Sequence, residues 1–226
     1  YGPGIVGKTN YVRGKLAEYG FEDASVVCTE TTWASGADWG SEELQARYVP
    51  KAYVRAMAAG LDILVWYAWR DGADGSLPGL LDNQLQPRPA YWAYWHMTEN
   101  LEGAHYMGPL DAAQLGSDSL VGYVFSNGDH RIDVLWTEDG TPYDPEDDPE
   151  VVFAAQGQAV RVADRLGNES LLQDADDLLL RQPLLLHPLD LLDVLDCAGY
   201  SNISSGPVFG GQAPCHSPLP SSHFHT

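Results

Sequence analysis

The sequence contains few cysteines and no recognisable metal-binding spacing. Its three cysteines, Cys28, Cys197 and Cys215, are too few and too scattered to define a disulfide framework. Cys28 lies in an apolar run and is expected to be a buried thiol, whereas a Cys197–Cys215 pair stays open for an oxidising compartment. No Cys-x-x-Cys or His/Cys spacing typical of zinc is present. The acidic runs 144–148 and 174–177 lack the glycine and distal glutamate of an EF-hand loop. We therefore expect neither a metal nor a cofactor.

Basic residues are also scarce. Lysine and arginine together number 12, against 32 aspartates and glutamates, and the formal net charge is −20. Phosphate backbones repel such a surface, which argues against a nucleic-acid partner. The chain has neither an apolar run of membrane length nor a secretory signal, so no membrane partner is expected. The first residue is Tyr1, and the opening stretch has the character of mid-domain sequence. We expect the chain to be a fragment of a longer protein.

Aromatic residues, by contrast, are abundant. The sequence has seven tryptophans and twelve tyrosines, many of them between Trp33 and Tyr106. Most are expected to fill a core. The remainder are compatible with a carbohydrate site, because sugar rings present flat C–H faces that pack on aromatic faces.

The first half of the chain has the pattern of a strand, a helix and a second strand. Residues 24–30 form a short apolar run rich in β-branched residues, typical of a buried strand, and end in a carboxylate. Ser41 can cap a helix that Gly60 ends. Residues 61–69 are a second, nearly continuous apolar strand. A strand, a capped helix and a strand within about 45 residues predict a βαβ unit with parallel strands.

Two further helices flank this unit. Residues 10–19 are predicted to form a helix ending at Gly20. The second helix is predicted from Pro89 to about Leu101, and because it is apolar nearly all round it should be covered on most sides. Pro50, inside the helix of the βαβ unit, should kink that helix or mark a restart.

The pattern changes near residue 108. Residues 120–125 and 131–136, joined through Asn127-Gly128, predict a β-hairpin, and residues 151–154 and 158–163 predict two more strands. We therefore expect domains at 1–108 and 109–177, the second being a small antiparallel β domain. The segment 178–226, rich in leucine, proline and serine, follows neither period and is expected to be a poorly ordered tail.

The most informative stretch for chemistry is Thr29-Glu30-Thr31-Thr32-Trp33. A carboxylate at the carboxyl end of a parallel strand stands where barrel enzymes place reactive groups. Polar neighbours can position Glu30, and Trp33 offers a sugar-stacking face nearby.

These residues resemble a known family. The segment 26–33 is similar to the seventh strand of clan A glycoside hydrolases, 65–71 to the eighth strand, and 79–94 to the lead-in to the eighth helix. The resemblance extends over residues 8 to about 105. It implies an α/β plus β fold: a partial (β/α)8 TIM barrel comprising the last helix of unit six and the strands and helices of units seven and eight. A small antiparallel β-sandwich-like module follows it.

The resemblance also implies a mechanism. Retaining glycosidases use two carboxylates about 5–5.5 Å apart, a nucleophile and a general acid/base. Glu30 stands at the nucleophile position, while the acid/base belongs to the fourth strand, upstream of this chain. Trp69 is the first candidate for the sugar platform and Trp33 the second, with Thr29 a further contact. Arg70 and Asp71 either bind sugar hydroxyls or form an ion pair at the barrel mouth.

The sequence leaves three interpretations open. The leading one is a secreted or extracellular glycosidase of an oligo- or polysaccharide, with xylan, glucan and mannan types all open. The second is a non-catalytic carbohydrate-binding protein that uses the aromatic-rich barrel mouth. The third is a structural or interaction protein with a β-rich adhesive module. The sequence does not indicate an oligomeric state.

Overall fold

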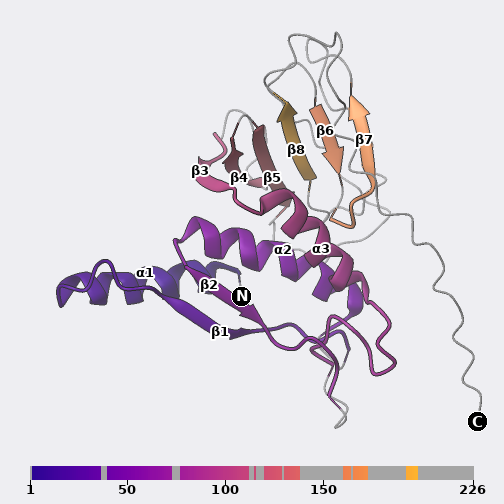
Figure 1. Cartoon of the computed structure of the whole chain (residues 1–226), viewed down its shortest axis with the longest axis horizontal. Coiled ribbons are helices and arrows are strands. Elements are labelled where there is room, and N and C mark those ends of the chain that lie inside the picture. The colour runs from indigo at the N-terminus through magenta and orange to yellow at the C-terminus, as the bar shows by residue number, and fades with distance from the viewer. Residues whose placement is uncertain are drawn as a thin grey trace, which may run out of the picture.

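A computed structural model of the 226-residue chain describes residues 2–36, 40–72, 77–111, 115, 120–128, 130–137, 160–163, 165–172 and 192–197. Three helices and eight strands lie in these ranges (Figure 1). In chain order the first five are α1 (Gly2–Glu18), β1 (Val27–Thr31), α2 (Glu42–Ala58), β2 (Ile63–Trp66) and α3 (Pro89–Leu101). They are followed by the strands β3 (His105–Pro109), β4 (Leu120–Asn127), β5 (His130–Thr137), β6 (Val160–Ala163), β7 (Glu169–Leu172) and β8 (Leu192–Cys197). None of the described helices is long and apolar enough to cross a membrane.

The predicted βαβ unit is confirmed. β1 and β2 pair in parallel, with Val27 opposite Ile63 and Cys28 opposite Leu64, and α2 connects them. Ser41 caps α2, because its Oγ accepts the backbone N–H of Leu44 at 3.1 Å. Beyond the end of α2, Gly60 adopts a left-handed φ of 72°, which glycine adopts at no steric cost.

Helix α1 is longer than the predicted 10–19 and begins at Gly2. Its end is as predicted: Gly20 has a φ of 76°, and Phe21 N–H donates to Leu16 O at 2.8 Å. Arg13 then joins α1 to the beginnings of both strands. Its guanidinium donates to Ala24 O at 3.2 Å and to Asp62 Oδ2 at 2.9 Å.

The sequence predicts that Pro50 kinks α2 or marks a restart. The helix does not restart, because it continues through Pro50 from Glu42 to Ala58. The side chain of Pro50 is fully buried. A buried ring gains packing contacts that offset the one backbone hydrogen bond a proline removes. This gain depends on the neighbours of α2 and is not visible in the local sequence.

Helix α3 has the predicted bounds, with Pro89 in its first turn. The prediction that it is covered on most sides is wrong. Ala90, Ala93 and Met97 are buried, whereas the Trp92 and Trp95 side chains are 48% and 49% exposed. Among the described residues, one aromatic face of α3 therefore stays open.

The two parallel strands are also less buried than predicted. Val27, Ile63 and Val65 are 44%, 52% and 43% exposed, while alternate residues such as Cys28 and Leu64 are half-buried. The prediction of a buried Cys28 thiol is likewise wrong. The helices lie against one face of this two-stranded sheet, and nothing in the described part of the chain covers the other.

The second half of the chain forms an antiparallel sheet of order β3-β4-β5-β8-β6-β7. The predicted hairpin is confirmed as β4 and β5, whose last pair is Asn127 opposite His130. The strand predicted at 158–163 is present as β6, and the one predicted at 151–154 lies outside the described residues. The described strands of this half, β3 to β8, form one sheet, and the second antiparallel sheet that a sandwich requires is not among them.

Strand β8 lies within the segment predicted as a poorly ordered tail. It pairs with β5 on one side and β6 on the other, and so occupies a central place in the sheet. For residues 192–197 the structure differs from the prediction, because pairing partners far away in sequence supply the backbone hydrogen bonds. The rest of the tail and Cys215 lie outside the described residues. The division at residue 108 stays a prediction, although β3 runs across it.

A shared core joins the helices to the sheet. Its buried members come from α2, α3, β4 and β5: Val54, Met97, Leu101, Phe125, Ile132, Val134 and Trp136. Arg55 of α2 lies over the Trp136 ring at 5.0 Å. At the other end of α2, Glu43 accepts from Arg165 Nη2 at 2.8 Å. The sheet and the helices therefore share an apolar interior, and the Glu43–Arg165 ion pair also joins them.

The shared core predicts a single cooperative unfolding transition. Phe125 is fully buried, so we expect Phe125→Ala to lower the free energy of unfolding by about 3–5 kcal/mol. Urea unfolding, followed by circular dichroism and by tryptophan fluorescence, measures this. The exposed Val27→Ala is the control and should change stability by less than about 0.5 kcal/mol. Two separate transitions in the wild type would contradict a shared core.

Asp62 predicts an acid-sensitive contact at the beginnings of β1 and β2. The backbone N–H of Val26, at 2.7 Å, and then Arg13 lower the pKa of the Asp62 carboxyl below its ordinary value. A lowered native pKa adds stability above the unfolded pKa of about 3.9, and that stability is lost as the pH falls through the native pKa. We expect Asp62→Asn to reduce the urea midpoint at pH 7 and to differ less from the wild type at pH 3. Glu99→Gln is the control, and an equal gap at both pH values would contradict the contact.

Candidate functional site

The predicted site residues gather where β1 and β2 end. Because the strands are parallel, their carboxyl ends lie at one edge, which is where barrel enzymes build active sites. The loop after β1 and the loop after β2 meet at this edge. Ser35 joins them, since its N–H and its Oγ both donate to Leu77 O, at 2.9 and 3.1 Å. In the second loop the peptide bond between Tyr67 and Ala68 is cis.

The Glu30 side chain is exposed and points away from the helices. Strict alternation would turn Glu30 to the same side as the half-buried Cys28. The register of β1 against β2 instead shifts between Cys28 and Thr31, and Thr29 and Glu30 are both exposed. Such an irregularity re-aims side chains in a strand. The Glu30 carboxylate makes no hydrogen bond or ion pair with any described residue, so it is free to meet a ligand.

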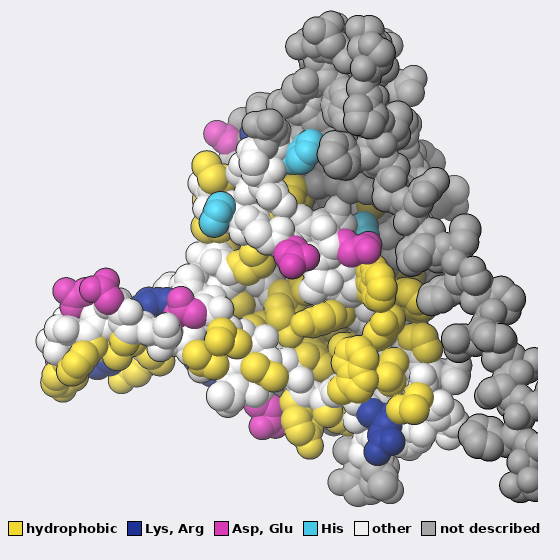
Figure 2. All heavy atoms as spheres, in the orientation of Figure 1, with side chains coloured by type: hydrophobic (Ala, Val, Ile, Leu, Met, Phe, Trp, Pro, Cys, Tyr) yellow, Lys and Arg dark blue, Asp and Glu magenta, His cyan; other side chains and the backbone are white. Residues whose placement is uncertain are grey.

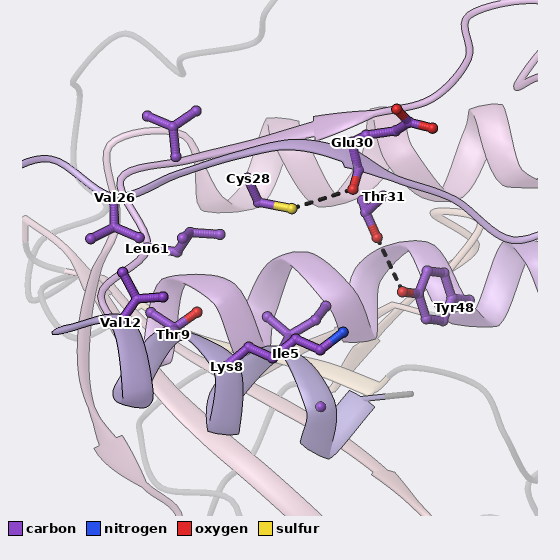
Figure 3. A pocket seen from close by; sticks show the side chains of 12 residues that line it. Ile5, Lys8, Thr9, Val12, Val26, Cys28, Glu30, Thr31, Tyr48 and Leu61 are labelled. Atoms are coloured by element: carbon purple, nitrogen blue, oxygen red, sulfur yellow. Dashed lines mark hydrogen bonds between the residues drawn. The ribbon is translucent and has the colours of Figure 1, made fainter. Parts of the chain in front are cut away.

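A cavity of about 410 Å³ lies on the opposite, helix-facing side of β1. Ile5, Lys8 and Thr9 of α1 line it together with Cys28 of β1. Figure 3 shows the Glu30 carboxylate directed away from this cavity, while only the backbone oxygen of Glu30 approaches it and accepts from Cys28 Sγ at 3.3 Å. The cavity is therefore separate from the carboxylate that carries the predicted chemistry.

The two candidate sugar platforms differ in accessibility. The Trp69 side chain is 59% exposed and meets the Tyr91 ring edge-on, with a centroid distance of 5.7 Å. Trp33 is half-buried, and its ring lies against Tyr48 at 5.1 Å with a tilt of 36°. Trp69 thus offers an open ring face, while Tyr48 covers part of Trp33.

Trp66 serves packing. Its side chain turns toward the helices and lies against the core formed by Ala46, Val49 and Leu80. Its Nε1 donates to Pro78 O at 3.1 Å. Trp66 therefore links the helix core to the loop after β2 through Pro78.

Asp71 is placed differently from Arg70. The Asp71 side chain is 1% exposed, and its Oδ1 accepts Gly79 N–H at 2.9 Å. Its Oδ2 pairs with Arg88, which in turn pairs with Glu42. Burial alone would lower the pKa of Arg88, but Asp71 and then Glu42 raise it above its ordinary value. Asp71 is thus an ion-pair residue whose partner is Arg88, and a sugar would have to break that pair to reach it.

Arg70 stays exposed at the same edge, where its backbone forms a bridge with Leu81. The predicted site residues whose side chains stay exposed at the ends of β1 and β2 are therefore Thr29, Glu30, Trp69 and Arg70. Within the described ranges, no three His, Cys, Asp or Glu side chains are grouped as metal ligands.

Sequence reasoning missed Arg88 and Gln45. Arg88, between two prolines, pairs with carboxylates 17 and 46 residues away. Gln45 is fully buried, and its amide contacts carbonyls of both loops. Neither residue belongs to a local motif, so only the three-dimensional contacts identify them.

Comparison with known proteins gives a match in fold only. No protein-family model and no curated protein sequence matches the chain. Among solved structures, it is similar to a family 39 glycoside hydrolase from the gut symbiont Bacteroides cellulosilyticus WH2. The TM-score is 0.59 at 16% identity, and the match covers 83% of this chain and 37% of that one. This chain thus has the fold of part of a glycoside hydrolase and spans little more than a third of that enzyme's length.

Two other solved structures match with TM-scores below 0.5. A GH30 endoxylanase from Clostridium papyrosolvens C71 gives 0.43 at 6% identity, covering 80% of this chain and 44% of that one. The protein SrfJ from Salmonella typhimurium gives 0.45 at 15% identity, covering 83% and 38%. Scores at this level do not establish a common fold.

The Asp71–Arg88 pair predicts a large loss of stability when it is broken. Asp71→Asn leaves Arg88 with Glu42 alone, and we expect the free energy of unfolding to fall by about 3 kcal/mol, as for other buried pairs. Urea unfolding measures the change. Arg70→Gln is the control and should cost less than about 0.5 kcal/mol. An Asp71→Asn protein of unchanged stability that had lost sugar affinity would instead make Asp71 a sugar ligand.

Proposed function

We propose that this chain is the nucleophile-bearing part of a retaining glycosidase that cleaves an oligo- or polysaccharide, with Glu30 as the nucleophile. The observation that carries this proposal is the exposed, unpaired Glu30 carboxylate at the carboxyl end of a parallel strand. The fold shared with a family 39 glycoside hydrolase adds support. Secretion of the protein would follow from a polysaccharide substrate outside the cell.

In this mechanism Glu30 attacks the anomeric carbon of the sugar. The glycosidic bond breaks as a second carboxylic acid protonates the leaving oxygen, and a covalent glycosyl-enzyme remains. The second group, now a carboxylate, takes a proton from water, and the water oxygen displaces Glu30 with net retention. Trp69 supplies a stacking face for a sugar ring. Thr29 and Arg70, both exposed, can hydrogen-bond to sugar hydroxyls.

The second carboxylate is proposed to come from a preceding part of the protein. Arg88 already holds Asp71, the buried carboxylate at this edge. In addition, the open face of the parallel sheet and the aromatic face of α3 expose large apolar side chains: Val27, Ile63, Val65, Trp69, Trp92 and Trp95. Figure 2 shows hydrophobic side chains gathered over this part of the molecule. Extended apolar surfaces of this kind mark interfaces, and the remaining units of a barrel would cover them.

The alternative of a non-catalytic carbohydrate-binding protein rests on the same aromatic edge. The open Trp69 ring is as suitable for holding a sugar as for presenting it to a nucleophile. The two functions differ in the role of Glu30, which forms a covalent bond only in the enzyme.

The coding sequence upstream of Tyr1 is the first test. The glycosidase proposal predicts five βα units and a sixth strand there, with an Asn-Glu pair after the fourth strand. The barrel-length protein is then compared with its Glu30→Gln variant on aryl glycosides. We expect activity to fall by about 10³-fold or more, because a covalent nucleophile is lost.

A fluorinated sugar that traps the intermediate identifies the attacked residue. Mass spectrometry should find the adduct on Glu30 in the wild type and no adduct in Glu30→Gln. Glu42→Gln, a change at an exposed glutamate on α2, is the control and should keep its adduct. An active Glu30→Gln protein without an adduct would exclude Glu30 as the nucleophile and favour the binding function.

A further inference from the structure

Gln45 lies in the first turn of α2, between the two loops at the site edge. Its side chain is completely buried. Its Nε2 lies 2.9 Å from Trp33 O in the loop after β1. The same nitrogen lies 3.3 Å from Pro78 O and 3.2 Å from Gly79 O in the loop after β2. One amide group thus joins two loops that are more than 40 residues apart in the sequence.

The orientation of this amide is determined by its surroundings. All three neighbours of Nε2 are carbonyl oxygens, which only accept hydrogen bonds. The reversed amide would aim Oε1 at three acceptors and would be repelled. Gln45 therefore acts as a donor to both loops, and no other side chain of its size has two N–H bonds and no charge.

Contacts beyond Gln45 extend to Trp69. Leu81 N–H donates to Trp69 O at 3.0 Å, so the segment that carries Pro78 and Gly79 lies along the segment that carries Trp69. A Cβ on Gly79 would stand 2.3 Å from Asp71 N and 2.6 Å from the carbonyl carbon of Arg70, both in the segment that follows Trp69. At this separation the two segments cannot move independently, and a shift of Gly79 is passed to Trp69.

We propose that Gln45 is a positioning residue that sets the separation of the Trp33 and Trp69 platforms and thereby the affinity for a sugar chain. This inference rests on the carbohydrate site proposed above. Gln45 touches neither the sugar nor Glu30. It acts through the two loops, whose separation decides whether one oligosaccharide can meet both rings.

The experiment measures oligosaccharide affinity with the 226-residue chain itself. Tryptophan fluorescence is titrated with the β-1,4-linked hexasaccharides of xylose, glucose and mannose, for the wild type and for Gln45→Glu. The substituted side chain keeps its size but presents a carboxylate to three carbonyl oxygens. We expect about tenfold weaker binding at pH 7, as for the loss of one or two buried hydrogen bonds. Affinity should partly recover at low pH, where the introduced carboxyl is protonated and can donate.

Two controls separate positioning from general destabilisation. Val54→Ala creates a cavity in the core of α2 without touching the loops and should leave affinity within about twofold while lowering the melting temperature. Asn127→Asp makes the same amide-to-carboxylate change in β4, where Asn127 Nδ2 donates to Glu102 O at 2.9 Å. It too should leave affinity unchanged. If Gln45→Glu does not fold, Gln45→Met removes the same donors without burying a charge and takes its place.

Hydrogen exchange adds a local measurement. In the Gln45 variant we expect faster exchange of the Ser35 amide, which donates to Leu77 O across the loops, with no change in β4. If the wild type binds and a folded Gln45 variant binds equally tightly, the positioning role is overturned and the carbohydrate site is not. A wild type that binds none of the three hexasaccharides would overturn the site and the positioning role together.

Discussion

The packing of α2 is the constraint on which the rest of the structure depends. Its Val49 and Ala52 are fully buried, and so is Val54, which belongs to the core shared with the antiparallel sheet. The hydroxyl of Tyr48 lies 3.1 Å from Thr31 Oγ1 at the end of β1, and the amide of Gln45 holds both loops. One helix therefore positions the strand that carries Glu30, the aromatic loops and the sheet. Buried contacts on several sides also explain why the helix accommodates Pro50.

Charge is used to connect distant segments. The sequence carries many more carboxylates than cations, so a cation placed between elements finds carboxylate partners. Arg13 joins α1 to Asp62, Arg88 joins the second loop to α2, and Arg165 joins the sheet to Glu43. In the last two pairs the arginine side chains are only 13% and 5% exposed. Pairs with a shielded partner are screened less by salt than exposed ones, so these contacts can fix the positions of whole elements.

Buried polar side chains at the strand ends and exposed apolar side chains on the open sheet face indicate different things. At the site edge, Asp71, Arg88 and Gln45 make hydrogen bonds or ion pairs with neighbouring segments. The Glu30 carboxylate makes none with a described residue. On the open face, the described part of the chain leaves apolar and aromatic side chains about half exposed. An exposed carboxylate at the end of β1 and an exposed tryptophan after the end of β2 suit a sugar. An uncovered sheet face suits a further protein segment. Both features agree with part of a barrel enzyme, and neither depends on the β-rich half of the chain.

The sequence by itself determined the features that depend on neighbouring residues. Ser41 and Gly60 mark the limits of α2, Pro89 begins α3, and Asn127-Gly128 lies at the turn of the hairpin, because capping and turn geometry are local. The βαβ order and the place of Glu30 at a strand end followed from the apolar runs. Only the tertiary structure decided what depends on partners far away in sequence. A register shift against β2 exposes Glu30, Arg88 takes Asp71 out of the site, and β5 and β6 pair with β8 inside the segment predicted as a tail. Burial, register and ion pairing depend on which distant segments come into contact, and the local sequence of each segment does not specify its partners.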